Sequence, residues 1–244
     1  MRSSVLSTLA VGAIAILATA QFVSAKQYDG LALPFREVTI SSPVQGQIIE
    51  QGASEGDEVT EGDLLARLFS RVEELQMDRA KAAREKKEFE YKGTQNLFRD
   101  KLISEDEMLD RKIELDLANL EYEIAQEQFE LRRIKAPISG IVVERLAEVG
   151  EMVTPNQSVY VVVDIEKLYI QFYAKAEDLR LLTVGAPATV AFPDLDTDRS
   201  FSGAIDFVDP RVDAASGLMR VRVLIENPDH VVKAGLRASI ALED

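Results

Sequence analysis

The side chains that most often carry enzyme chemistry are scarce in this sequence. The 244 residues include one histidine, His230, and no cysteine. One imidazole cannot build a catalytic triad or a multi-histidine metal site, and a chain without cysteine has no thiol nucleophile, thiolate metal site or disulfide. Asp194, Asp196 and Asp198 have the alternate spacing of a calcium loop. The glycine and the closing glutamate of that motif are missing.

The sequence therefore predicts no catalytic residue, no bound metal and no cofactor. No glycine-rich phosphate-binding loop follows a predicted strand, which argues against nucleotide binding. The formal net charge is −14 at pH 7, and no basic stripe offsets it, which argues against nucleic-acid binding. The surfaces left for function are those that contact other proteins.

Glycine and proline recur in two stretches that are offset by 94 residues. Residues 42–68 and 136–162 align without a gap. The most restrictive matched positions are Pro43 with Pro137, Gly46 with Gly140, and Gly56 with Gly150. Proline marks the edge or start of a strand, and glycine marks a turn or the close approach of another backbone. One copy has too little apolar surface to fold alone, so we expect the two copies to form one flattened β-sandwich.

The residues between the two copies have the composition of a helical hairpin. They are rich in charged residues and helix formers and contain no proline. Gly93 is a weak point of the first helix. Ser104 is an N-cap for the second helix, with Glu107 three residues later in a capping box. Two helices of nearly equal length, joined by residues 99–103, predict an antiparallel hairpin about 44 Å long.

Apolar residues form stripes on both predicted helices. The first helix carries Leu68, Val72, Leu75, Ala82 and Phe89, interrupted by Arg79 and Lys86. The second helix carries one stripe of Ile113, Leu117, Leu120, Ile124 and Leu131, and another of Met108, Leu115, Tyr122 and Phe129. These two stripes lie about 140° apart, so one can pack on the first helix. We expect the Met108 stripe to face a neighbouring subunit or partner; the alternative is one broad face of ordinary hairpin packing.

The remaining segments complete the predicted organisation. Residues 1–25 contain Arg2, an apolar stretch and terminal small residues, the pattern of a signal peptide; an uncleaved N-terminal anchor is the alternative. Short alternating strands and one short helix after residue 165 predict a small β-barrel. The fold class is α+β, mainly β. The predicted domains are a β-sandwich of residues 38–69 and 134–164, a helical hairpin of residues 70–133, and a β-barrel of residues 28–37 and 165–244.

The paired half-motifs resemble the biotinyl/lipoyl-type domain, whose true carriers hold a modifiable lysine in the turn between the halves. Here the hairpin occupies that place, so we expect no carrier lysine. A lipoyl-like domain split by a helical hairpin resembles the membrane fusion protein (HlyD-like periplasmic adaptor) family of bacterial efflux and secretion systems. The resemblance covers about residues 30–244. Many such adaptors continue into a membrane-proximal domain, which we do not expect here because the sequence ends with the barrel.

The resemblance implies a non-enzymatic adaptor in the periplasm of a Gram-negative bacterium, associated with the inner membrane. The implied partners are an inner-membrane transporter of the RND type, an outer-membrane channel, and further copies of the chain in a ring. An ABC-type exporter or secretion system is the alternative transporter. Two alternatives belong to other functional classes. A lipoyl-type carrier would need a modifiable lysine at a β-turn. A free-standing periplasmic binding protein would bind a ligand without any partner.

The family's hairpin tip carries an arginine, a leucine and a serine that meet the outer-membrane channel. Arg99, Leu102 and Ser104 match these residue types, and Lys101 and Ile103 lie among them. The resemblance therefore implies that this tip contacts the channel. The alternative is structural: Leu102 and Ile103 close the end of the hairpin, and Ser104 only caps the second helix.

Overall fold

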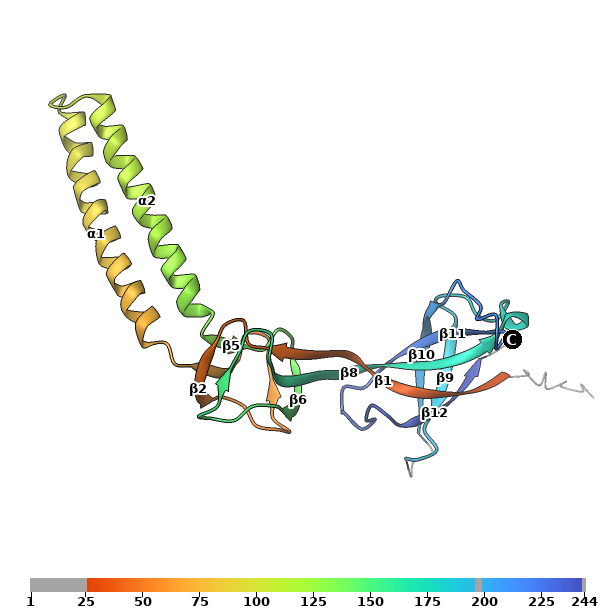
Figure 1. The fold of residues 1–244 in the computed structure, drawn as a ribbon. Coiled ribbons are helices and arrows are strands. Elements are labelled where there is room, and N and C mark those ends of the chain that lie inside the picture. The colour runs from red at the N-terminus through yellow and green to blue at the C-terminus, as the bar shows by residue number, and fades with distance from the viewer. Residues whose placement is uncertain (1–25, 196–198, 243–244) are drawn as a thin grey trace, which may run out of the picture.

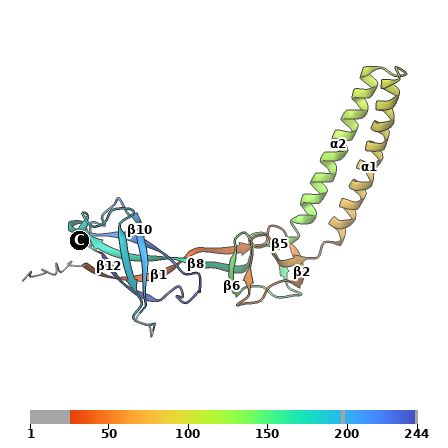
Figure 2. The same ribbon diagram turned by 180° about the vertical axis from the view of Figure 1, so that it is seen from behind.

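The computed structural model describes residues 26–195 and 199–242, and in it the chain forms three units in a row (Figure 1). A helical hairpin projects from a small β-sandwich, and two long strands connect the sandwich to a β-barrel, as the view from behind also shows (Figure 2). The predicted signal peptide lies outside the described residues. Within the described ranges, neither helix of the hairpin has the length and apolarity to cross a membrane.

Two strands, β1 (Lys26–Ser41) and β8 (Ser158–Lys175), run through both the sandwich and the barrel. They pair antiparallel, with an irregularity between Pro34 and Arg36. The helices are α1 (Arg71–Arg99), α2 (Glu105–Glu130) and the 3-10 helix η1 (Ala176–Asp178). The other strands are β2 (Gly46–Gln51), β3 (Glu58–Val59), β4 (Leu64–Leu68), β5 (Arg133–Lys135), β6 (Gly140–Arg145), β7 (Met152–Val153), β9 (Pro187–Ala191), β10 (Ser200–Val208), β11 (Leu218–Glu226) and β12 (Arg237–Leu242).

The two copies of the repeat exchange strands within the sandwich. β3 pairs with β6, where Val59 lies opposite Gly140. β7 pairs with β2, where Val153 lies opposite Gly46. Val153 is the equivalent of Val59 in the second copy, and Gly140 is the equivalent of Gly46, so the two strand pairs are equivalent. Each copy therefore completes the sheet of the other. Pro43 and Pro137 lie in bends shortly before β2 and β6, where proline removes no ladder hydrogen bond.

The turns of the sandwich show the same symmetry. The backbone N–H of Gly56 donates to the carbonyl oxygen of Val142, and that of Gly150 donates to Ile48, each over 2.8 Å. Both glycines have positive φ angles, 91° and 93°, in the left-handed region that favours glycine. The repeated glycines therefore place two equivalent turns that tie the copies together.

The apolar core of the sandwich is shared by both copies. Leu65 and Leu68 of the first copy pack in one buried cluster with Val142 and Val159 of the second. Tyr160 is fully buried among them, and its hydroxyl donates to the carbonyl oxygen of Leu65 over 2.9 Å. The prediction of one sandwich built from both copies is confirmed.

The barrel closes because β1 and β8 pair with each other and with its other strands. The order is β1-β12-β9-β10-β11-β8, and β8 pairs back to β1. Inward-facing residues alternate along β8, including Leu168, Ile170 and Phe172, which are fully buried. The helix that the sequence predicts at about residues 176–182 is only the single turn η1.

The hairpin consists of α1 and α2, which lie antiparallel. The hydroxyl of Ser104 accepts a hydrogen bond from the N–H of Glu107 over 3.2 Å, which satisfies one of the free donors at the start of α2. α1 continues without interruption through Gly93, so this glycine does not break the helix. A Cβ added at Gly93 would meet no atom within 4 Å.

Gly93→Ala should stabilise α1 by about 0.5–1 kcal/mol, since alanine loses less backbone entropy in a helix than glycine does. The measurement is the free energy of unfolding from urea titrations followed by circular dichroism. Gly56→Ala is the matched control, because its added Cβ also meets open space but its φ of 91° disfavours alanine by about 1–2 kcal/mol. A loss of stability in Gly93→Ala would contradict the prediction.

Candidate interaction surface on the helical hairpin

The contact between α1 and α2 is mixed in character and only partly buried. Ala118 and Ala125 are the buried residues of α2, and no residue of α1 is buried. The guanidinium group of Arg84 lies over the ring of Tyr122, 4.4 Å from its centroid. Such a cation–π contact joins the helices without a large aliphatic side chain.

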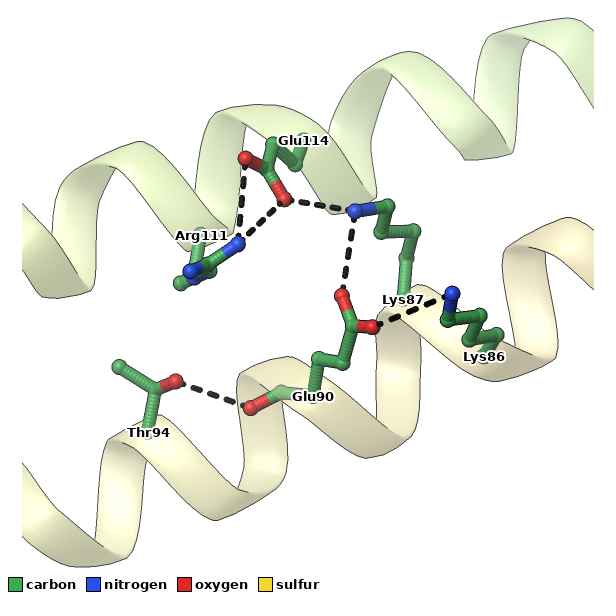
Figure 3. Close-up of polar contacts among 6 residues, drawn as sticks. All are labelled: Lys86, Lys87, Glu90, Thr94, Arg111 and Glu114. Atoms are coloured by element: carbon green, nitrogen blue, oxygen red, sulfur yellow. Dashed lines mark hydrogen bonds and ion pairs between the residues drawn. The ribbon is translucent and has the colours of Figure 1, made fainter.

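A network of ion pairs adds to this contact (Figure 3). Lys87 donates to Glu114 across the helices over 2.8 Å and to Glu90 on its own helix over 3.1 Å. Arg111 donates to Glu114 over 3.0 Å. Hydrogen bonds from Lys87 and Arg111 hold the pKa of the Glu114 carboxyl below its ordinary value. The hydrogen bond from Lys87 likewise lowers the pKa of Glu90.

Glu114→Gln should make the stability of the hairpin less dependent on pH in the acidic range. A carboxyl group with a lowered pKa stabilises the folded state fully above its unfolded pKa of about 4.3, and this is lost as the pH falls through the lowered value. Glutamine keeps the size but does not titrate. Thermal unfolding of the helices, followed between about pH 3 and pH 7, checks this. Glu121→Gln, at an exposed residue without an ion pair among the described residues, should change nothing; equal behaviour of the two variants would contradict the prediction.

The structure reverses the roles that the sequence predicts for the two stripes of α2. Tyr122 contacts α1 through Arg84, and a spacing of seven residues puts the rest of its stripe on the same side. Every member of that stripe is half-buried: Met108, Leu115, Tyr122 and Phe129. The stripe expected to pack on α1 is exposed instead: Ile113, Leu117, Leu120, Ile124 and Leu131. The expectation that the Met108 stripe faces a partner is therefore wrong.

Leu68, which the sequence analysis assigns to the stripe of the first helix, lies instead in β4 and is buried in the sandwich core. The members of that stripe that do lie on α1 face away from the hairpin contact. Val72 and Leu75 are exposed, and Phe89 is 80% exposed. The character of the contact explains the exposure of both aliphatic stripes. The contact between the helices uses alanines, which allow close approach, together with ion pairs and a cation–π contact, and none of these stands out in an aliphatic pattern. The aliphatic residues that do stand out remain available on the outer sides.

The tip of the hairpin has a defined backbone. The N–H of Lys101 donates to Phe98 over 2.8 Å, and the N–H of Leu102 donates to Leu97 over 2.9 Å, the pair of bonds of a Schellman motif. Lys101 occupies the left-handed position of that motif with φ of 59°, where glycine is usual. No glycine marks this turn in the sequence, so its position is not predictable from the residue pattern.

This turn sets the exposure of the predicted tip residues. Leu102 is 69% exposed at the end of the hairpin. Ile103 is half-buried, and Ser104 caps α2. Arg99 donates to the side-chain oxygen of Asn96 over 2.9 Å. Ile103 and Ser104 thus have structural roles, whereas Leu102 presents an apolar side chain to whatever meets the tip.

We next consider metal-binding groups and the single histidine in the part of the chain that the structure describes. There, no group of three or more acidic or histidine side chains is placed to hold a metal ion. His230 lies near Glu58, with 3.6 Å between Nδ1 and Oε1, in a cavity of about 530 Å³ between sandwich and barrel. The outer sides and the tip of the hairpin are therefore the main candidate surfaces.

Two protein-family models match the chain. Residues 36–165 match the barrel-sandwich hybrid domain of RND MFP, and residues 168–244 match the CusB-like β-barrel domain. Multidrug resistance protein MdtA of Proteus mirabilis is 27% identical over 216 residues, covering 79% of this chain and 52% of that protein. Cobalt-zinc-cadmium resistance protein CzcB of Cupriavidus metallidurans is 23% identical over 203 residues, covering 77% and 39%.

Solved structures share the fold. A MacA chimera that contains the MexA α-hairpin domain of Pseudomonas aeruginosa has a TM-score of 0.75 at 21% identity, covering 90% of this chain and 78% of that one. A putative efflux transporter from Bacteroides eggerthii has a TM-score of 0.72 at 24% identity, covering 89% and 68%. The chain spans about half the length of the curated relatives that it matches first. Since the first family model covers more than half of its residues, the chain belongs to the RND membrane fusion protein family.

Proposed function

We propose that the chain is a non-enzymatic periplasmic adaptor that links an inner-membrane transporter to an outer-membrane channel in an efflux system. The observation that carries the proposal is the geometry of the hairpin, whose exposed apolar tip lies at the opposite end of the molecule from the barrel. Relatives named for multidrug and metal-cation resistance support efflux as the process.

Each unit has a separate role in this proposal. The tip residues contact the channel: Arg99, Lys101, Leu102, Ile103 and Ser104. The outer sides of the hairpin contact further copies in a ring, and the barrel faces the transporter and the inner membrane. The family model described as RND favours an RND-type transporter. A HlyD-like adaptor of an ABC-type exporter would keep the same bridging role and differ only in the inner-membrane partner.

Cysteine cross-linking in cells tests the proposal, because the chain has no cysteine of its own. Arg99→Cys and Leu102→Cys place reactive thiols at the tip, and Glu61→Cys places one on an exposed turn of the sandwich as the control. We expect the tip variants to capture an outer-membrane channel and the control to capture none. Efflux that continues while no tip variant captures a channel would overturn the proposal.

A further inference from the structure

The hairpin stands on the sandwich through two short connections. Phe69 and Ser70 lead from β4 into α1, and Leu131 and Arg132 lead from α2 into β5. The backbone N–H of Leu68 donates to the carbonyl oxygen of Arg132 over 2.8 Å, so the two connections lie side by side. The apolar side chains at this base, Phe69 and Leu131, are exposed. Apolar packing therefore does little to set the direction in which the hairpin leaves the sandwich (Figure 1).

The Arg132 side chain bridges the hairpin and the sandwich. One guanidinium nitrogen, Nη2, donates to the Glu73 carboxylate in the first turn of α1 over 2.5 Å. The other, Nη1, donates to the backbone carbonyl oxygen of Gln45 over 2.7 Å. The side chains of Arg132 and Glu73 are only 21% and 17% exposed. Charge-assisted hydrogen bonds that are partly shielded from water are stronger than ion pairs on an open surface.

Gln45 lies directly before β2, at the point where the two copies of the repeat meet. The next residue, Gly46, pairs with Val153 of the second copy. A Cβ added at Gly46 would lie 3.0 Å from Nη1 of Arg132, so the glycine permits the close approach of the guanidinium group. Arg132 is therefore anchored on backbone that both copies hold in place.

A guanidinium group suits this bridge because its fork is planar and rigid. Two of its nitrogens fix the directions of two hydrogen bonds at once, whereas a lysine ammonium on its flexible stem does not. α1 has 29 residues, which at about 1.5 Å per residue span roughly 44 Å. A change of roughly 10° at the base would therefore move the tip by about 8 Å.

We propose that Arg132 is a positioning residue. By holding the first turn of α1 to the sandwich, it fixes the direction of the hairpin and therefore the position of the tip. The ion pair of Lys135 with Glu130 also spans the base, over 2.7 Å, but it joins α2 only to the strand that follows it and is more exposed. Arg71 pairs with Glu74 within α1. The inference rests on the proposed function only for what the tip meets.

Distances between spin labels on the purified chain test this role, because the chain has no cysteine of its own. Labels at Gln95→Cys near the tip and Glu61→Cys on the sandwich, both at exposed residues, report the direction of the hairpin. In double electron–electron resonance we expect a narrow distribution of distances for the parent chain. Arg132→Gln should shift or broaden this distribution by about 8 Å, and Arg132→Lys should do so in part, since it keeps the charge but loses the fork.

Two controls separate the direction of the hairpin from its folding. Arg71→Gln removes an exposed guanidinium group from the same end of α1 and should leave the distribution unchanged. A second pair of labels, at Gln95→Cys and Glu121→Cys, lies within the hairpin, and Arg132→Gln should leave its distance unchanged. An unchanged distribution between tip and sandwich in Arg132→Gln, an equal change in Arg71→Gln, or a change within the hairpin itself would overturn the proposal.

Channel capture in cells tests the adaptor function separately. Arg132→Gln in the Arg99→Cys chain should lose most of the capture that the parent shows, whereas Arg71→Gln should keep it. If the parent captures no channel, the adaptor function fails, and the spin-label distances still decide whether Arg132 sets the direction of the hairpin.

Discussion

Gly140→Ala is expected to destabilise the protein by about 3 kcal/mol, the upper end of the usual cost of overpacking. A Cβ at this position would lie 2.3 Å from the carbonyl oxygen of Val163 and 3.1 Å from the backbone nitrogen of Asp164. Both atoms belong to the backbone of β8, which is shared by the sandwich and the barrel. Neither domain can move this strand away without disturbing its own hydrogen bonds.

Gly46→Ala is the matched control, because Gly46 is the equivalent position in the first copy of the repeat. Its added Cβ would meet the guanidinium group of Arg132 at 3.0 Å and Cβ of Leu68 at 3.1 Å, which is a milder clash than the 2.3 Å at Gly140. Distances of 3.0–3.2 Å require shifts of only a few tenths of an ångström, so we expect a loss of about 1 kcal/mol, at the low end of overpacking costs. Urea unfolding of both variants gives the comparison. Equal losses, or full tolerance of Gly140→Ala, would show that the β8 backbone is not the obstacle.

The sandwich could be predicted from the sequence because the glycines and prolines that indicate it are required by the backbone conformation. Gly56 and Gly150 mark positive φ angles, and Pro43 and Pro137 mark the places where no ladder donor is needed. These requirements hold whatever the neighbouring side chains are. A repeat of such positions therefore predicts two equivalent units, and their mutual pairing follows from the small size of each unit.

The faces of the hairpin could not be predicted in the same way. An aliphatic stripe predicts burial, but it does not say whether the burial occurs within one chain or between chains. In α2 the more aliphatic stripe, which includes Ile113 and Ile124, is exposed, and the contact with α1 uses Ala118, Ala125 and Tyr122. The aliphatic pattern therefore marks an exposed side of the hairpin and not the contact between its two helices.

The position of Leu102 depends on a turn that the sequence does not mark. A Schellman motif normally has glycine at its left-handed position, and here that residue is Lys101. The motif ends α1 and leaves Leu102 as the most exposed apolar residue of the tip. Because Leu102 makes little contact within the chain, a change there separates effects on partner binding from effects on folding.

Leu102→Asp should abolish most of the proposed contact with an outer-membrane channel without unfolding the hairpin. A central apolar anchor of an interface contributes about 2 kcal/mol or more, so its loss weakens binding roughly 30-fold. The measurements are the minimum inhibitory concentration of an exported compound and the yield of channel captured through Arg99→Cys. Gln95→Glu, at an exposed residue near the tip, adds the same charge without removing an apolar group and should leave both unchanged. If Leu102→Asp keeps full efflux and full channel capture, Leu102 does not contribute to the channel contact.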